Sequence, residues 1–193
     1  MWPWEHLAVG YILYSLWRRS RRRTNPPVAG TVLVLGFATQ LPDLVDKPLG
    51  WGTTLLPGGH SLMHSLFVAV PVVTVVWVVT RRRNRAPLGV AFGIGYLSHL
   101  PGDVVYPYLT DGVLGWRFLL WPAIPADNTV RTEVLGRGVE LVGEYVAFLG
   151  TPRALGYLGV EAVLIGTALA LWYADGLPVL SEIRLVVRGL IAP

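Results

Sequence analysis

LFVAVPVVTVVWVVTRRR, residues 66–83, is the stretch of this sequence that decides the fold. Residues 66–79 carry no charge, and three arginines follow Thr80 directly. Valine-rich runs also suit buried strands, but the length of the apolar segment, about 61–80, favours a helix. A membrane-spanning helix needs roughly 20 apolar residues. The stretch therefore predicts a transmembrane helix that ends at a basic loop.

The composition of the whole chain points the same way. Of its 193 residues, 53% are hydrophobic and 15% are charged, whereas a soluble domain carries about a quarter charged residues. Cysteine is absent, which excludes disulfides, a thiolate zinc site and a cysteine nucleophile. We expect a single membrane domain over residues 1–193.

Further apolar segments complete the predicted fold. They cover residues 2–17, 28–41, 86–100 and 154–173, and a short amphipathic tail follows at 180–190. Segments 28–41 and 86–100 are short for a span and would also suit core helices of a soluble protein, but the overall apolarity favours the membrane. We predict an all-α, polytopic bundle of about five apolar helices plus amphipathic helices. Residues 1–125 would carry a metal site, and residues 126–193 an outer amphipathic segment, the fifth helix and the tail.

Two arginine runs indicate the topology. They consist of Arg18, Arg19, Arg21, Arg22 and Arg23, and of Arg81, Arg82, Arg83 and Arg85. Such runs can bind nucleic acid, but each lies in a short connector between apolar segments, which is typical of cytoplasmic loops. We therefore expect a multi-pass protein of the plasma (inner) membrane with its N-terminus outside, and no nucleic-acid partner.

With this topology, every histidine and several acids fall on the outer side. They are His6, Asp43, Asp46, His60, His64, His99 and Asp103. Imidazole and carboxylate groups bind zinc, manganese or iron, and such groups are costly at membrane depth without partners. We predict that all seven are metal ligands. A lone His6 could instead be an interfacial residue, and Asp46 could simply pair with Lys47.

The spacing suggests how the ligands are arranged. His60 and His64 are four residues apart at the start of segment 61–80, so a helix would place them on one face. His99 and Asp103 have the same spacing, interrupted by Pro101. Asp43, His64 and Asp103 are the residues to which we assign catalytic roles.

Other polar residues carry weaker signals. Glu140 and Glu144 are possible additional ligands, although a solvated helix face is the simpler interpretation. Glu161 lies inside segment 154–173, where an acid suggests a function. Four outer arginines could meet an anionic substrate or lipid headgroups; they are Arg117, Arg131, Arg137 and Arg153.

Three phrases give the chain a family resemblance: Leu41–Asp46 (LPDLVD), Gly59–Ser65 (GHSLMHS) and Ser98–Asp103 (SHLPGD). With His6 and Gly10, they resemble the YdjM-like family of inner-membrane, metal-dependent hydrolases over residues 1–125. The family is also described as contacting a regulator, which nothing in this sequence supports. The resemblance implies a chemistry class and not a substrate.

That family is distantly similar to the zinc-dependent phospholipase C group, whose helical enzymes hold several zinc ions. By that likeness His6, Asp43, His60 or His64, His99 and Asp103 would be ligands. The group takes its last ligands from a later His and Glu, and this chain has no histidine after His99. Unless Glu140 or Glu144 substitutes, the likeness implies one or two metals rather than three.

We therefore expect a membrane-embedded hydrolase that uses a divalent metal, most simply zinc, to cleave a phosphoester or lipid-type substrate at the extracytoplasmic face. Its partners would be membrane lipids and an anionic or lipid-linked substrate. A non-catalytic metal-binding or transport protein and a membrane scaffold are the alternatives. The polar group lies at helix ends rather than at mid-membrane, which favours the enzyme over a transporter. No pattern indicates the oligomeric state.

Overall fold

Helix α4, Ala86–Asp111, lies at the centre of the fold and packs against α1, α2 and α3. The computed structural model describes residues 1–22, 25–125 and 134–191, and no strand occurs in these ranges. The predicted all-α class is confirmed. The other helices are α1 (Pro3–Ser20), α2 (Ala29–Gly52), α3 (Leu66–Arg82), η1 (Arg117–Leu120), α5 (Val134–Leu149), α6 (Pro152–Ala174) and α7 (Leu180–Ile191). Arg23 and Arg131 lie outside the described residues.

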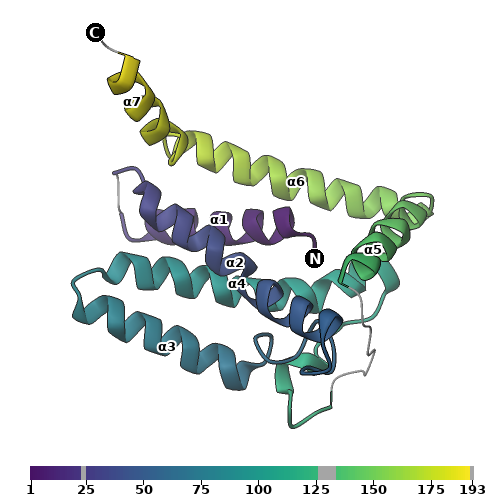
Figure 1. The fold of residues 1–193 in the computed structure, drawn as a ribbon. Helices are drawn as coiled ribbons and strands as arrows, with labels where there is room; N and C mark the ends of the chain where they lie inside the picture. Colours follow the sequence, from purple (N-terminus) through teal and green to yellow (C-terminus); the bar gives the residue numbers. More distant parts are fainter. Residues whose placement is uncertain (23–24, 126–133, 192–193) are drawn as a thin grey trace.

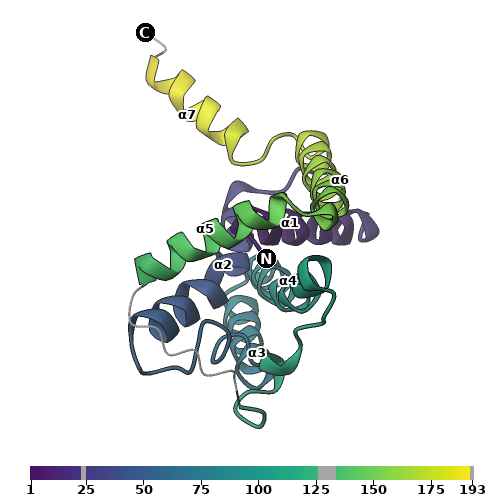
Figure 2. The same cartoon turned by 90° about the vertical axis from the view of Figure 1, so that its right-hand side faces the viewer.

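The helices are arranged in rows around α4. Helices α3 and α4 lie side by side, α1 runs along α4, and α6 runs along the other side of α1 (Figures 1 and 2). Helix α2 packs against both α1 and α4, whereas α7 extends away from the rest (Figure 1). The start of α1, the second halves of α2 and α4, and the turn before α3 meet in one region.

Two helices continue further than we predicted. Proline lacks an N–H donor and its ring crowds the preceding turn, so the sequence suggested that helices end near Pro42 and Pro101. In the structure α2 continues to Gly52 and α4 to Asp111, with both prolines inside them. The prediction was wrong because packing of α2 against α4 outweighs the local preference. As a result Asp43, Asp46 and Asp103 all lie on helices.

Helix α3 begins later than predicted. Ser65 caps it by accepting a hydrogen bond from the Phe67 N–H at 3.1 Å, and serine oxygens commonly satisfy the free N–H groups of a first turn. His60 and His64 therefore lie in the turn before the helix. The expectation that they share a helix face is wrong.

Glycine makes the contact between α2 and α4 possible. A Cβ atom at Gly95 would lie 2.6 Å from the Leu35 carbonyl oxygen and 3.0 Å from the Ala38 Cβ atom. Small residues of this kind let helices in membrane proteins approach closely. The approach fixes the distance between the helices that carry Asp43 and His99.

Replacing Gly95 with alanine is expected to lower stability by about 1–3 kcal/mol, the usual cost of overpacking. Thermal unfolding of the purified protein measures the change. Gly166→Ala on α6 is the matched control, because its Cβ atom would meet nothing within 4 Å and alanine favours helices. Equal melting temperatures for the two variants would contradict the close approach.

One described helix, α6, is long and apolar enough to cross a membrane by itself. Helix α3 is apolar but has 17 residues. The predicted set of five membrane-crossing helices is therefore not confirmed. Large apolar side chains nevertheless remain exposed along the other helices, among them Leu7, Leu33, Phe37, Phe67 and Val75. An apolar surface of this extent is typical of contact with lipid or protein.

Candidate metal centre

Four chain segments bring histidines and aspartates together. Helix α1 provides His6, α2 provides Asp43, the turn before α3 provides His60 and His64, and α4 provides His99 and Asp103. The two α4 residues are one helical turn apart, so they face the same way. Apart from the partly exposed His60, these side chains are buried. Six of the seven predicted ligands therefore share one region.

Asp103 lies at the middle of the cluster. Its Oδ2 atom is 3.0 Å from His99 Nε2, 3.3 Å from His64 Nε2 and 3.5 Å from His60 Nε2. Its Oδ1 atom is 3.3 Å from His6 Nε2 and accepts a hydrogen bond from the Met1 amino group at 2.6 Å. One carboxylate thus contacts all four histidines.

Asp43 faces the cluster with one oxygen only. Asp43 Oδ1 lies 3.5 Å from His64 Nε2 and 3.8 Å from His99 Nε2. The other oxygen accepts a hydrogen bond from Lys47 Nζ at 2.5 Å. Lys47 therefore does not pair with Asp46, the alternative that the sequence left open; the lysine orients Asp43 instead.

The donor atoms form two overlapping groups that could each hold a metal ion. Asp43, His60, His64 and Asp103 make up the first, and His6, Asp43 and His99 the second. Within each group the ligand atoms lie within 4.8 Å of one another. Asp43 belongs to both, as a carboxylate that bridges two ions would. The His6 and His99 rings also stack, with centroids 3.7 Å apart.

Several of these atoms lack any hydrogen-bond partner. They are both ring nitrogens of His6, Asp43 Oδ1 and Asp103 Oδ2. Leaving a buried polar atom unpaired costs about 1–3 kcal/mol, and more for a charged one, so proteins rarely tolerate a group of them. A cation bound among these atoms would satisfy them together, and the residues present therefore fit a metal ion.

The outer contacts of His64 and His99 indicate which ring nitrogen of each donates away from the cluster. His99 Nδ1 lies 2.7 Å from the Thr39 carbonyl oxygen, and His64 Nδ1 lies 2.8 Å from Asp46 Oδ2. Both partners only accept, so both Nδ1 atoms donate. In neutral rings the two Nε2 atoms then carry lone pairs, yet they face each other at 3.0 Å. Histidines that bind metals through one nitrogen commonly have this kind of outer hydrogen bond on the other.

Asp46 supports the turn rather than facing the cluster. Its carboxylate is fully buried and accepts hydrogen bonds from the backbone N–H groups of Ser61, Met63 and His64 as well as from the His64 ring. It belongs to neither of the two groups that could hold a metal. The structure therefore places it behind His64 and does not bring it to the site as a ligand.

Both central carboxyl groups lie beyond the apolar segments and are held as carboxylates. Burial alone would raise the pKa of Asp103, but the four surrounding histidines outweigh burial and hold it well below its usual range. Burial acts in the same direction on Asp43, where His64 and Lys47 outweigh it and lower its pKa. Anionic oxygens are the form that binds a metal ion.

The two later glutamates do not join the cluster. Glu140 and Glu144 lie on α5 and form ion pairs with Arg137 at 3.1 and 2.8 Å. Neither belongs to a group of described residues that could hold a metal. They lie on an exposed face of α5, where they pair with Arg137. This agrees with the simpler interpretation of the sequence, a solvated helix face.

Two features near the site had little or no sequence signal. Glu5 is buried beside His6 and accepts hydrogen bonds from the Trp2 N–H at 2.6 Å and the Tyr157 hydroxyl at 2.8 Å, which connects α1 to α6. Its position next to a predicted ligand was the only hint. The Thr39 carbonyl that orients His99 is a backbone atom, so no residue type reveals it. Glu161, the acid inside segment 154–173, accepts a hydrogen bond from the Trp4 indole at 2.7 Å.

The cluster and the arginine runs lie at opposite ends of the same helices. His6 is near the start of α1, and Arg18 and Arg19 are in its last turn. His64 lies just before α3, which ends at Arg81 and Arg82. The sequence predicted this separation from charge alone, and the helix order confirms it.

Comparison with known proteins assigns the family. No curated protein and no solved structure matches the chain. The model of the YdjM inner membrane protein family matches residues 1–178, which includes every residue of the His/Asp cluster and extends well beyond the motifs themselves. The chain therefore belongs to the YdjM inner membrane protein family.

Proposed function

We propose that this protein is a metal-dependent hydrolase that cleaves a phosphoester in a lipid-type substrate. One observation carries the proposal: the possible ligand atoms of Asp43, His64, His99 and Asp103 are buried and face one another at 3.0–3.8 Å. Carboxylate oxygens and ring nitrogens packed this closely favour a positive charge among them. If the cluster only stabilised the fold, side chains that are hydrogen-bonded to one another or apolar would do so without the cost of burying unpaired charges.

The donor set favours zinc, since it combines imidazole and carboxylate groups without thiolate; manganese or iron would also accept such ligands. Asp43, His60, His64 and Asp103 would hold one ion, and His6, Asp43 and His99 a second. A bound ion of this kind lowers the pKa of water toward about 7 and stabilises negative charge on a phosphoryl oxygen. Asp43 would be a ligand in both groups.

The chain's own side chains divide the remaining work. Lys47 holds one oxygen of Asp43, which leaves Oδ1 directed at the cluster, where it can either bind an ion or accept a hydrogen bond from a water molecule and orient it. His60 is the exposed member, with 44% of its side chain accessible. The substrate would therefore enter on the His60 side. Arg117, exposed in η1, would attract its phosphate group.

The surface beside His60 supports an amphiphilic substrate. The Phe118 ring lies 5.6 Å from the His60 ring, and Leu114 and Trp116 in the same loop remain 52% and 48% exposed. An acyl chain could pack on these side chains while the phosphate reaches the cluster. The resemblance of the motifs to zinc-dependent phospholipase C supports the choice of a phosphoester.

Membership of an inner membrane family, together with the exposed apolar helices, supports a multi-pass arrangement. In this proposal the arginine runs face the cytoplasm, and the N-terminus and the His/Asp cluster lie at the extracytoplasmic face.

The proposal predicts chelator-sensitive hydrolysis. Purified protein in detergent should release the headgroup from a phospholipid or a chromogenic phosphodiester, lose that activity after exhaustive chelation, and regain it with zinc or manganese. The control is the Glu140→Gln/Glu144→Gln variant, which should behave like the wild type because both side chains lie outside the cluster. Tight metal binding without turnover of any phosphoester would favour the non-catalytic alternative.

A further inference from the structure

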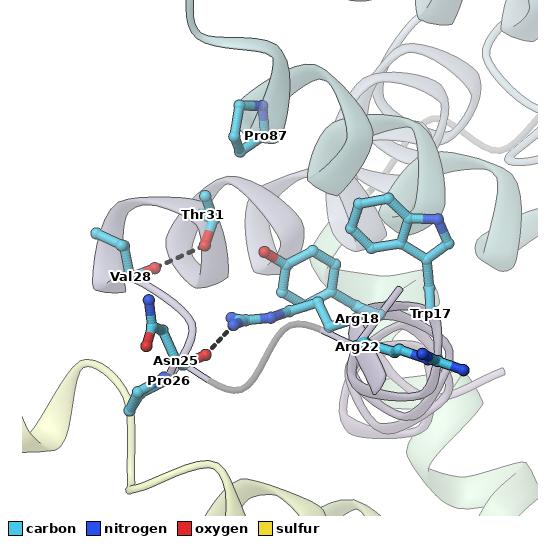
Figure 3. A pocket seen from close by; sticks show the side chains of 9 residues that line it. Trp17, Arg18, Arg22, Asn25, Pro26, Val28, Thr31 and Pro87 are labelled. Atoms are coloured by element: carbon cyan, nitrogen blue, oxygen red, sulfur yellow. Dashed lines mark hydrogen bonds between the residues drawn. The ribbon is translucent and has the colours of Figure 1, made fainter. Parts of the chain in front are cut away.

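At the end of the molecule away from the His/Asp cluster, two hollows share a wall. The first has a volume of about 400 Å³ and lies between the end of α1 and the start of α2, with Pro87 of α4 at its edge (Figure 3). The second, of about 440 Å³, lies between the end of α1 and the end of α6. The shared wall consists of Arg18, Arg22, Asn25 and Pro26. The proposed hydrolase does not use this end.

The hollows carry an excess of positive charge. Arg18 and Arg22 line both, and Arg19 lines the second. Asp175 is the one carboxylate among the residues that line them. It lies 2.8 Å from Arg19 and also accepts hydrogen bonds from Tyr11 and Ser15. Asp175 therefore offsets the charge of Arg19 and leaves that of Arg18 and Arg22.

The Arg18 side chain retains donors for a ligand. It extends across the first hollow toward Asn25 and donates to that residue's backbone carbonyl (Figure 3). That contact uses a neutral acceptor and one of the five N–H groups that a guanidinium offers. A phosphate group takes two parallel N–H bonds from such a fork, which makes arginine the usual phosphate ligand.

The first hollow also has an apolar side. Trp17 lies on its α1 side, and Val28, 69% exposed, borders it from the start of α2. Tryptophan favours the level of lipid headgroups, and basic pockets between helices on the cytoplasmic side suit anionic headgroups. Aromatic and aliphatic side chains beside two arginines match a headgroup phosphate with acyl chains attached.

We infer that the hollow between α1 and α2 is a binding site for the phosphate group of an anionic ligand, held by Arg18 and Arg22. An anionic phospholipid of the cytoplasmic leaflet supplies this chemistry, and a soluble phosphate ester supplies the same group without the chains. The site is distinct from the His/Asp cluster and does not depend on its chemistry.

Binding of short-chain phosphatidylglycerol to the purified protein, followed by native mass spectrometry or calorimetry, tests the inference. The Arg18→Gln/Arg22→Gln variant should bind the lipid at least about tenfold more weakly, because it loses both arginines that line the two hollows without a carboxylate partner among the lining residues. The Arg81→Gln/Arg82→Gln variant removes the same charge at residues that line neither hollow, and it should stay close to wild type. Both variants should keep their metal content. If the double variant at 18 and 22 does not fold, the exposed Arg22→Gln alone should show a smaller loss in the same direction.

Each comparison has a decisive result. Glycerol phosphate that binds as well as the lipid, with the same dependence on Arg18 and Arg22, would support the phosphate site and identify a soluble ligand. Equal losses in the two double variants would overturn the inference, since any positive surface would then suffice. Equal binding of phosphatidylglycerol and zwitterionic phosphatidylcholine would also overturn it, because two arginines whose charge no lining carboxylate offsets should favour the lipid with a net negative charge.

Discussion

Replacing Asp103 with asparagine should abolish metal binding and hydrolysis together. The side chain keeps its shape but loses the negative charge that faces all four histidines. Mutation of a residue that only orients a metal ligand weakens metal binding by about 10- to 100-fold. Loss of a ligand itself should have a larger effect, so we expect metal binding to be at least about 100-fold weaker. Elemental analysis and turnover of a phosphodiester measure the two effects.

The control for Asp103→Asn is Asp111→Asn on the same helix. Asp111 is exposed near the end of α4 and accepts a hydrogen bond from Thr110, so the variant should keep both metal and activity. A folded Asp103→Asn protein with wild-type metal content would show that Asp103 is not a ligand. Retained turnover after complete metal loss would remove the proposed mechanism while leaving the fold untouched.

Replacing Asp46 with asparagine should weaken the site without removing a ligand. Its carboxylate accepts hydrogen bonds from three backbone N–H groups and from the His64 ring N–H. The NH2 group of asparagine cannot accept a hydrogen bond, so some of these N–H groups would lose their acceptor. We expect about 10- to 100-fold weaker metal binding, as for other contacts that orient a ligand, and reduced stability of the turn. Metal titration and thermal unfolding separate the two effects.

Asp175→Asn is the matched control for Asp46→Asn. Asp175 also accepts hydrogen bonds from several side chains, but it lies at the other end of α1. We expect this variant to lose stability and to bind metal normally. If both variants changed metal affinity equally, the effect of Asp46 would be a general loss of stability, and its role in orienting His64 would be contradicted.

The sequence predicted the helical class and the residues that meet, because both depend on patterns within one segment. The apolar stretch 66–79 and the arginines after it indicate where a helix ends, and charge alone placed the histidines opposite the arginine runs. His60 and His64 lie near Asp103, as the charge pattern predicted, but the separate expectation that they share a helix face is wrong. They are held by a turn anchored on Asp46 rather than by a helix face.

The errors arise where contacts between segments overrule local preference. Pro42 and Pro101 are local signals for a helix end, yet α2 and α4 pack on each other and continue through them. Asp46 has the residue type and the position of a ligand, and only the path of the turn shows that N–H groups already occupy its oxygens. The close approach at Gly95 could not be foreseen either, because its partner, Leu35, lies on another helix. The division of residues 1–193 into a metal-site part and an outer part stays a prediction.

The central claim is that the His/Asp cluster binds a metal, and the metal content of the purified wild-type protein tests it most directly. Protein prepared without chelator, and protein reloaded after chelation, should contain one to two equivalents of zinc, manganese or iron, as the two groups that share Asp43 imply. The Asp103→Asn protein should contain almost none. Wild-type protein that holds no metal under either condition would contradict the account, because nothing would then satisfy the unpaired atoms of His6, Asp43 and Asp103.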